Sequence, residues 1–432
     1  MQRVFNVIAI SFTLAWAQLP ATAETTVLDA ARLIDVDNQR VVESPRVIVI
    51  DGRIVSVGET DALDIPTGAT HLVLEGATLL PGLMDAHVHL TSRHDLHGYR
   101  SVTVTTPGSA ITGTVNAKRT LLAGFTTVRN LGASGWADIA VRDAIDSGEI
   151  IGPRILAAGP ALGITGGHCD TNLLPPEYEE RSDGVADGPW AVRTAVRRNI
   201  KYGADVIKFC GTGGVLSKGT SIGAQQYTYE EMAALVDEAH LLGRRVAVHA
   251  HGTQGIKTAI RAGVDSVEHA SLIDDEGIRL AKKNGTYLSM DIYVSDYILS
   301  EGEAAGILPE SLDKERQVGS AQRESFNRAV KAGANIAFGT DAGVYPHGQN
   351  ARQLAYLVRY GMTPMQAIYT ATLGNATLFG IERDTGSVRE GKAADIIAVQ
   401  GDALENIRLL ESVDFVMKDG EVYLDRLSSS TH

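Results

Sequence analysis

The stretch LPGLMDAHVHL (residues 80–90) carries an apolar run that ends in two histidines, His87 and His89. A short apolar run bounded by turn residues is typical of a buried strand. Seven more runs of this kind follow along the chain, and each precedes a polar or glycine-rich loop and then a helical stretch such as 230–242 or 351–360. The eight predicted strands are 84–89, 126–129, 154–157, 206–209, 245–249, 266–268, 287–290 and 336–338.

Strands that alternate with helices predict a parallel sheet in an α/β protein. Eight strand–helix units within about 300 residues favour a closed (β/α)₈ TIM barrel, which we place at residues 81–385. The alternative is a doubly wound open sheet. No G-x-G-x-x-G motif opens a helix after the first strand, and this argues against the open sheet.

Both ends of the chain are rich in short β runs with turn signals between them. Residues 47–50 and 54–57 flank Asp51-Gly52, which is a strong hairpin signal. Similar runs occur at 395–399 and 415–423. We therefore predict one small β-sandwich domain built from residues 24–80 and 386–432, with the barrel between them.

The composition excludes several classes of protein. Of 432 residues, 44% are hydrophobic and 21% are charged, as in a globular protein. The formal net charge of −13 argues against nucleic acid as a partner, because an acidic surface repels phosphate groups. The two cysteines, Cys169 and Cys210, are too few for a disulfide scaffold or a thiolate zinc finger, and whether they pair stays open.

The first 23 residues have the pattern of a signal peptide. Arg3 precedes the apolar run 4–17, and LPATA (19–23) is a small-x-small cleavage signature. The apolar run is shorter than the ~20 residues that span a bilayer. The alternatives are a core strand or an uncleaved anchor. We expect cleavage near Ala23 and a secreted or periplasmic product that does not associate with a membrane.

Polar side chains interrupt most of the predicted strands at their carboxyl ends, where the reactive residues of such a barrel lie. His87 and His89 are two positions apart, so their side chains share one face of the strand. Two imidazoles on one face can chelate a metal ion, although a single histidine is more often part of the core. The residues predicted to bind metal are His87, His89, Lys208, His249, His269 and Asp341. Nitrogen and oxygen donors without thiolates favour zinc or a similar divalent ion.

Lys208 lies between Ile207 and Phe209 in an apolar strand, where an unpaired ammonium group costs free energy. One interpretation is a structural lysine that pairs with an aspartate or reaches the mouth of the barrel. The other is chemical: a desolvated lysine has a lowered pKa and a free lone pair, with which it can capture CO₂ as a carbamate. The carbamate would be an anionic ligand able to bridge two metal ions.

The chain resembles the amidohydrolase superfamily of metal-dependent hydrolases, in particular its imidazolonepropionase-like and Xaa-Pro dipeptidase-like branch. The stretches that carry the resemblance are LPGLMDAHVHL (80–90), GFTTVRNLG (124–132), DVIKFCGTGGV (205–215), VAVHAHG (246–252), VEHAS (267–271), FGTDAG (338–343) and GSVREGKAADIIAV (386–399). The last stretch matches the return of the family's chain into its small β-sandwich.

The resemblance implies two divalent metal ions, which we expect to be Zn²⁺. The two ligand sets that it implies are His87, His89, Lys208 and Asp341, and N6-carboxylated Lys208, His249 and His269. Whether His249 or His251 is the ligand is less certain from the residues alone. The family pattern favours His249 and leaves His251 near the substrate.

The remaining polar residues of these loops have candidate roles in catalysis. Asp341 would accept a proton from the attacking water and pass it to the departing amine. His251 or His168 would donate a hydrogen bond to the oxyanion, although His168 could equally be an exposed loop residue. Tyr227, with Tyr229 beside it, could bind a substrate carboxylate or could anchor its loop. The other candidates for binding that carboxylate are Arg93, His94 and Arg100, although a run of such residues is usually a solvated loop. The role of His347 is undecided in the same way.

The combined prediction is a binuclear metal-dependent amidohydrolase that cleaves an amide or peptide bond to a C-terminal amino acid. Such an enzyme would be a dipeptidase, a carboxypeptidase or an N-acyl amino acid amidase, with ochratoxin-type amides among its possible substrates. One alternative is a cyclic amide hydrolase of the imidazolonepropionase type or a mononuclear deaminase; Lys208 argues against a deaminase. The non-enzyme alternative is a metal-free scaffold barrel. We expect a small-molecule substrate and a homo-oligomer.

Overall fold

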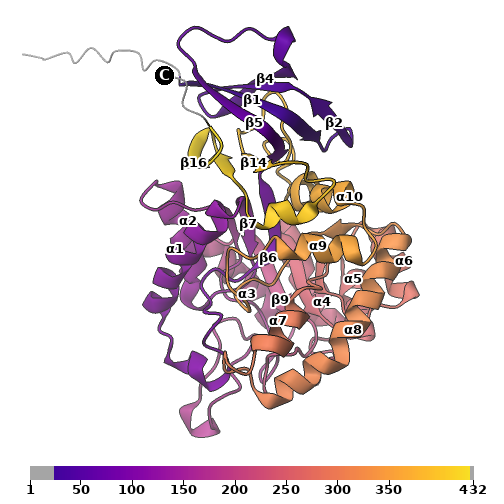
Figure 1. Cartoon of the computed structure of the whole chain (residues 1–432). Coiled ribbons are helices and arrows are strands. Elements are labelled where there is room, and N and C mark those ends of the chain that lie inside the picture. The colour runs from indigo at the N-terminus through magenta and orange to yellow at the C-terminus, as the bar shows by residue number, and fades with distance from the viewer. Residues whose placement is uncertain (1–23, 429–432) are drawn as a thin grey trace, which may run out of the picture.

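The computed structural model describes residues 24–428, so the predicted signal peptide lies outside the described residues. Two parallel sheets form the middle of the chain (Figure 1). All eight predicted strands are present, and their ends agree with the prediction to within one residue. The three-stranded sheet has the order β6-β7-β8, with β6 (Leu83–Val88), β7 (Phe125–Asn130) and β8 (Arg154–Ala157). The five-stranded sheet has the order β13-β12-β11-β10-β9, with β9 (Val206–Cys210), β10 (Arg245–Ala250), β11 (Ser266–His269), β12 (Tyr287–Ser289) and β13 (Ile336–Ala337).

Backbone hydrogen bonds join the outer strands of these two sheets. Next to β8 and β9, Asp205 N donates to Ala157 O over 2.8 Å. Next to β6 and β13, Ala86 N donates to Phe338 O over 2.8 Å, and His89 N donates to Ala342 O over 2.7 Å. The carboxyl ends of all eight strands therefore face the same region of the molecule.

Helices surround the parallel strands (Figure 1). The α-helices are α1 (Thr106–Leu122), α2 (Ala137–Asp146), α3 (Pro189–Lys201), α4 (Tyr229–Leu241), α5 (Thr253–Ala262), α6 (Asp275–Asn284), α7 (Val294–Glu301), α8 (Pro309–Lys331), α9 (Arg352–Arg359), α10 (Pro364–Tyr369) and α11 (Asn375–Phe379). Short 3₁₀ and π turns are η1 (Thr60–Ala62), η2 (Gly98–Thr103), η3 (Ser134–Trp136), η4 (Pro176–Tyr178), η5 (Thr370–Gly374) and η6 (Ile407–Glu411). Helix α4 starts at a capping box, in which the side chains of Thr228 and Glu231 each accept from the other's backbone N–H. Within residues 24–428 no helix combines the length and apolarity that crossing a bilayer requires.

The two ends of the described chain meet in one mixed sheet of eight strands, which lies above the parallel strands in Figure 1. Its order is β16-β15-β14-β5-β1-β3-β4, with β2 paired to β1. Its strands are β1 (Thr25–Asp35), β2 (Arg40–Glu43), β3 (Pro45–Ile50), β4 (Arg53–Glu59), β5 (Thr70–Pro81), β14 (Ile396–Gln400), β15 (Phe415–Lys418) and β16 (Glu421–Asp425). Strand β14 pairs antiparallel with β5, so the far ends of the sequence share one ladder. All eight strands belong to one continuous sheet. The sandwich arrangement and the exact domain boundaries stay predictions.

The predicted hairpin at Asp51-Gly52 connects β3 and β4. Both residues have positive φ, +47° for Asp51 and +77° for Gly52. A two-residue hairpin of type I′ requires this conformation, which glycine adopts without strain. The pair Ile50–Arg53 therefore sets the start of the β3–β4 register.

Arg154 connects the parallel strands to the mixed sheet. From β8 its guanidinium contacts Asp395 Oδ2 at 2.9 Å and Asp419 Oδ1 at 2.6 Å, in the segments before β14 and β16. The Asp395 carboxylate is buried and also accepts from Thr385 Oγ1. Arg154 therefore neutralises a buried charge at the boundary between the two parts.

We expect Arg154→Met to lower the free energy of unfolding by about 1–3 kcal/mol, because Asp395 would stay buried without a cation. The matched control is Arg408→Met, which breaks the exposed ion pair with Glu411 and should cost no more than about 0.5 kcal/mol. Scanning calorimetry of both variants measures the difference. Equal shifts in melting temperature would contradict a role for Arg154 at this boundary.

Candidate metal centre

A cavity of about 760 Å³ lies at the carboxyl ends of the parallel strands. Most of the predicted site residues line it, although they come from distant parts of the sequence. The residues brought together are His87, His89, His168, Lys208, His249, His251, His269 and Asp341. The fold therefore gathers every predicted metal ligand into one cavity.

One cluster in the cavity consists of His87, His89 and Asp341. Asp341 Oδ1 lies 3.2 Å from His89 Nε2 and 3.5 Å from His87 Nε2. Burial alone would raise the pKa of Asp341, but His87 and His89 outweigh it and hold that pKa below its usual range. Asp341 has a φ of +57°, which is uncommon for a residue other than glycine. Its N–H donates to His87 O over 2.8 Å, which secures this conformation.

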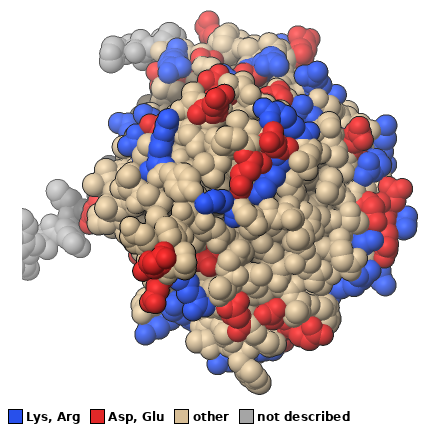
Figure 2. Space-filling model, turned by 90° about the horizontal axis from the view of Figure 1, so that it is seen from below, with Lys and Arg blue, Asp and Glu red and all other residues tan. Residues whose placement is uncertain are grey.

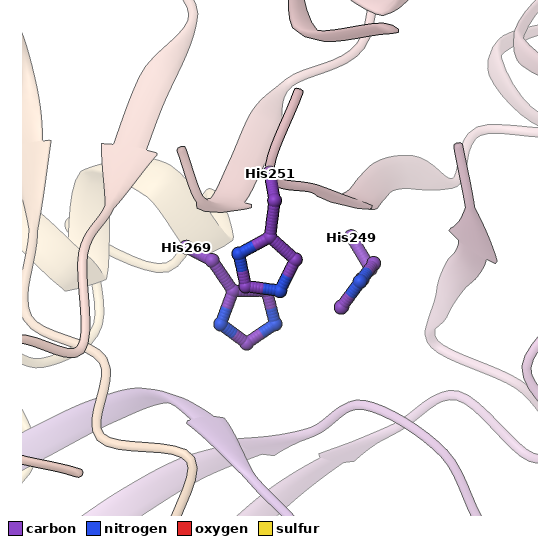
Figure 3. A group of neighbouring side chains, drawn as sticks. All are labelled: His249, His251 and His269. Atoms are coloured by element: carbon purple, nitrogen blue, oxygen red, sulfur yellow. The ribbon is translucent and has the colours of Figure 1, made fainter. Parts of the chain in front are cut away.

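A second cluster consists of His249, His251 and His269, from the ends of β10 and β11 (Figure 3). The rings of His251 and His269 are stacked, with centroids 4.8 Å apart, and the His249 ring lies 4.5 Å from His269 in an edge arrangement. His269, Asp291 and Asp341 form a third group whose ligand atoms all lie within 4.8 Å of one another. Since Asp341 belongs to the first cluster and His269 to the second, the two clusters form one continuous centre.

The partners of the Nδ1 atoms determine which histidines offer Nε2 as an electron-pair donor. His269 Nδ1 lies 2.9 Å from Asp291 Oδ2, and His89 Nδ1 lies 3.4 Å from Gly132 O. His87 Nδ1 lies 3.4 Å from Glu268 Oε2, without full hydrogen-bond geometry. These oxygens only accept hydrogen bonds, so they favour a proton on Nδ1, and a neutral ring in that tautomer leaves the Nε2 lone pair free.

Glu268 is itself held in place by Arg129. Arg129 Nη2 donates to Glu268 Oε1 over 2.8 Å, and Arg129 Nε donates to Ala86 O over 2.7 Å. Both side chains are fully buried. Burial would raise the pKa of Glu268, but the Arg129 charge outweighs it and keeps the carboxylate ionised.

His168 and His251 have hydroxyl partners instead. His168 Nδ1 lies 2.8 Å from Ser217 Oγ, and His251 Nδ1 lies 2.8 Å from Ser271 Oγ. A hydroxyl can donate or accept, so these two rings can present either a lone pair or an N–H at Nε2. Burial lowers the pKa of His168 to about 3, so its imidazole is neutral near pH 7.

Lys208 is buried in β9, with 3% of its surface exposed. Burial lowers the pKa of its ammonium group to about 8, although Glu268 and Asp341 act in the opposite direction. Among residues 24–428, no carboxylate lies within 4 Å of its Nζ, and its Nζ makes no hydrogen bond. The structure therefore does not support the interpretation that Lys208 is half of a buried lysine–aspartate pair.

The prediction that Tyr227 binds a substrate carboxylate needs correction. Tyr227 is 1% exposed and does not line the cavity, and its hydroxyl donates to Ala186 O over 3.0 Å. The loop after β9 turns its phenol into the core, where it anchors the segment before α3. Tyr229 is the first residue of α4 and is exposed, so it does not reach the cavity either.

The other undecided residues have mostly structural contacts. Arg93 lines the cavity and pairs with Asp95 at 2.7 Å, while Arg100 donates to Ala304 O. His94 does not line the cavity. His347 is buried beside the metal-centre strands, with Nε2 3.2 Å from His89 O and Nδ1 3.1 Å from Thr120 Oγ1. It therefore supports the backbone of His89.

Several residues around the centre were not assigned from the sequence. Asp291 lies two residues after the end of β12, so the same strand-end signal that identified the histidines would have found it. Glu268 precedes His269 but reads as one of many acidic residues until Arg129 is placed beside it. Lys218 lines the cavity, donates from Nζ to Tyr99 Oη over 2.7 Å, and has no carboxylate within 4 Å among residues 24–428. Cys169 and Cys210, left open above, form a disulfide.

Comparisons with known proteins agree with the resemblance that the motifs indicate. The sequence model of the Amidohydrolase family matches residues 78–423. An ochratoxinase from Aspergillus niger is 34% identical over 432 aligned residues, which cover 93% of this chain and 87% of the ochratoxinase. An imidazolonepropionase from Symbiobacterium thermophilum is 23% identical, covering 80% of this chain and 81% of that protein.

Solved structures match over nearly the whole chain. A Xaa-Pro dipeptidase with methionine bound in its active site has a TM-score of 0.86 and 39% identity, covering 93% of this chain and all of the dipeptidase. The crystal structure of the A. niger ochratoxinase has a TM-score of 0.83 and 32% identity, covering 94% of this chain and 96% of that structure.

We expect Asp291→Ala to weaken Zn²⁺ binding by about 10–100-fold, because His269 Nδ1 would lose the carboxylate that orients its ring. Competition with a chromogenic chelator measures the affinity. Asp143→Ala is the control, since Asp143 is exposed and pairs only with Arg142. Equal affinities in the two variants would contradict the orienting role of Asp291.

Proposed function

Because the chain belongs to the amidohydrolase family, we propose that it is a binuclear metal-dependent hydrolase that cleaves the amide bond to a C-terminal amino acid. The observation that carries the proposal is the gathering of the six predicted histidines, Asp341 and the buried Lys208 in one cavity. A structural core would not place so many titratable groups together, since burying them without a ligand is unfavourable.

The donor set fits two divalent ions. His249 Nε2 is buried without any hydrogen-bond partner among the described residues, as expected of an atom that receives a metal ion. One ion would be held by His87, His89 and Asp341, and the other by His249 and His269. Imidazole and carboxylate donors favour Zn²⁺.

Lys208 would connect the two ions as its carbamate. The neutral Nζ lone pair forms a bond to the carbon of CO₂ and the nitrogen loses a proton, which leaves an anionic carbamate with two oxygen ligands. Burial supports this reaction because it lowers the pKa of Lys208 to about 8 and so increases the neutral fraction. The absence of a carboxylate partner for Nζ leaves this group free to react.

The contacts of His249 and His251 favour His249 as the ligand. His249 Nε2 has no partner, whereas His251 Nδ1 contacts the Ser271 hydroxyl, which can donate and so leave an N–H at Nε2 of His251. His251 would then face the substrate, in agreement with the preference that the resemblance implies.

In the reaction, the bound ions would lower the pKa of a water molecule and polarise the scissile carbonyl. Asp341 would accept a proton from the attacking water through its carboxylate and donate it to the amide nitrogen as the C–N bond breaks. Its lowered pKa keeps the carboxylate ionised near pH 7, the state that an acceptor of this proton requires. Without this transfer the nitrogen would leave as a strongly basic anion.

His168 and His251 would stabilise the oxyanion that forms on the carbonyl oxygen. In both residues the serine hydroxyl at Nδ1 can donate, which places the proton on Nε2. The Nε2–H groups then act as donors where negative charge develops.

The rest of the cavity suits an acyl amino acid. An apolar wall contains Leu173, Val215, Val294, Ile298 and Val318. The partly exposed Lys218 provides a cation at the opening, in the role that Tyr227 was predicted to have. Relatives named as ochratoxinase and Xaa-Pro dipeptidase support an amide between an acyl group and an amino acid.

The closed barrel is part of the same proposal. We place the parallel strands in a closed (β/α)₈ barrel, supported by the hydrogen bonds at both sheet boundaries.

The location and the partners of the enzyme are also part of the proposal. The Cys169–Cys210 disulfide supports an extracytoplasmic location, since disulfides persist in oxidising compartments. Figure 2 shows basic and acidic side chains interspersed on one face, with no large basic region, which supports small-molecule substrates rather than nucleic acid. A homo-oligomer stays a prediction.

We expect wild-type protein to contain about two metal ions per chain, and Lys208→Ala to lose at least one ion and most of its activity. Elemental analysis and amide hydrolysis are measured on the same samples. Short carboxylic acids should restore part of the activity, because they can replace the carbamate oxygens. Full metal content and full activity in Lys208→Ala would overturn the bridging role.

The substrate is tested with N-acyl amino acids, their C-terminal amides and simple lactones. We expect hydrolysis of the free acids to be favoured, and Lys218→Ala to raise KM for the acids about tenfold through loss of a charge-assisted hydrogen bond. KM for the C-terminal amides should not change.

Lys201→Ala, at the exposed end of α3, is the matched control. It should leave KM for the acids and KM for the C-terminal amides unchanged. Equal wild-type rates on acids and amides would exclude a carboxylate site. Activity confined to lactones would overturn the amidase proposal.

A further inference from the structure

The disulfide between Cys169 and Cys210 is part of the cavity wall. Cys210 is the last residue of β9, two positions after Lys208. Cys169 lies in the long connection between β8 and α3, directly after His168. The covalent bond therefore joins a loop that carries one cavity histidine to the strand that carries the buried lysine.

His168 makes its contacts with elements that follow β9, although its own segment follows β8. Its N–H donates to Gln226 Oε1 over 3.0 Å, and its Nδ1 lies 2.8 Å from Ser217 Oγ. Its ring stacks on that of His249, with centroids 4.0 Å apart and planes at 27°. The ring also lies flat against Gly214, where an added Cβ would come within 2.3 Å of it. These contacts define one position for the ring and leave Nε2 free.

The segment that carries His168 has little regular structure of its own. Between β8 and α3 it contains the short turn η4, and isolated bridges pair Leu162 with Phe209 of β9 and Gly163 with Val185. Asn172 and Leu173, just beyond the disulfide, also line the cavity. A long irregular loop samples many conformations unless it is tied to a rigid element, and a covalent link to a buried strand restricts it strongly.

We propose that the Cys169–Cys210 disulfide is a positioning element, which holds the His168 imidazole on His249 and so directs its Nε2–H at the reacting carbonyl. This inference rests on the proposed amide hydrolysis. Without the bond, the loop would sample positions in which His168 no longer reaches the transition state. The expected loss is in kcat rather than in KM, because the oxyanion forms only in the transition state.

A double-mutant cycle tests the coupling between the disulfide and His168. The four proteins are wild type, Cys169→Ser/Cys210→Ser, His168→Ala and the triple variant. We expect loss of the disulfide to lower kcat about 10–100-fold when His168 is present, and less than twofold in the His168→Ala background. KM should change little in either background.

Reduction of the folded wild-type enzyme gives a second measurement that does not depend on how the variants fold. Tris(2-carboxyethyl)phosphine converts the disulfide to two thiols and is itself oxidised to the phosphine oxide. It should lower kcat of the wild type and leave the Cys169→Ser/Cys210→Ser protein unchanged, which also controls for effects of the reagent on bound metal. Hydrogen exchange of residues 163–187 should become faster on reduction, while residues 266–269 in β11 stay protected.

The outcomes separate this inference from the proposed function. An equal loss of kcat in both His168 backgrounds, or no loss on reduction, would overturn the positioning role while the hydrolase remains. A wild-type protein that hydrolyses none of the amides would overturn the proposed function and the role of the disulfide in it.

Discussion

The ion pair between Arg129 and Glu268 connects the two parallel sheets through the interior of the molecule. Arg129 comes from β7 in the three-stranded sheet, and Glu268 comes from β11 in the five-stranded sheet. The guanidinium also donates to Ser266 Oγ and to Ala86 O in β6. A buried ion pair depends on further hydrogen bonds to its polar atoms, and here the additional guanidinium contacts bring strands from both sheets together. The position of the metal centre depends on this arrangement.

The same pair controls the chemistry of the centre. Arg129 keeps Glu268 ionised, and the carboxylate in turn faces His87 Nδ1, which leaves Nε2 of His87 free for a ligand. Asp291 does the same for His269. Lys208 lies among these charges without an ion-pair partner in residues 24–428, and burial lowers the pKa of its ammonium group to about 8.

In the proposed function, the substrate would contact different parts of the chain from those that hold the metal ions. The centre is built at the ends of strands, but the apolar wall, Lys218 and His168 belong to loops and to α7 and α8. The disulfide covalently connects the end of strand β9 to the loop that carries His168. The relatives that match most of this chain are named for different substrates.

The sequence by itself predicted the eight strands, the β-rich character of both chain ends and the six candidate ligands. Those features are local, since hydrophobic period, turn residues and strand-end polar residues can be recognised within a few positions. The loop after β9 shows where local sequence patterns stop predicting the structure. Tyr227 and Lys218 both lie in it, and only packing decides that the phenol turns into the core while the cation faces the cavity. The partners of the histidines and the pairing of Cys169 with Cys210 were also decided by tertiary structure, because each joins residues that are distant in sequence and meet only when the strands assemble.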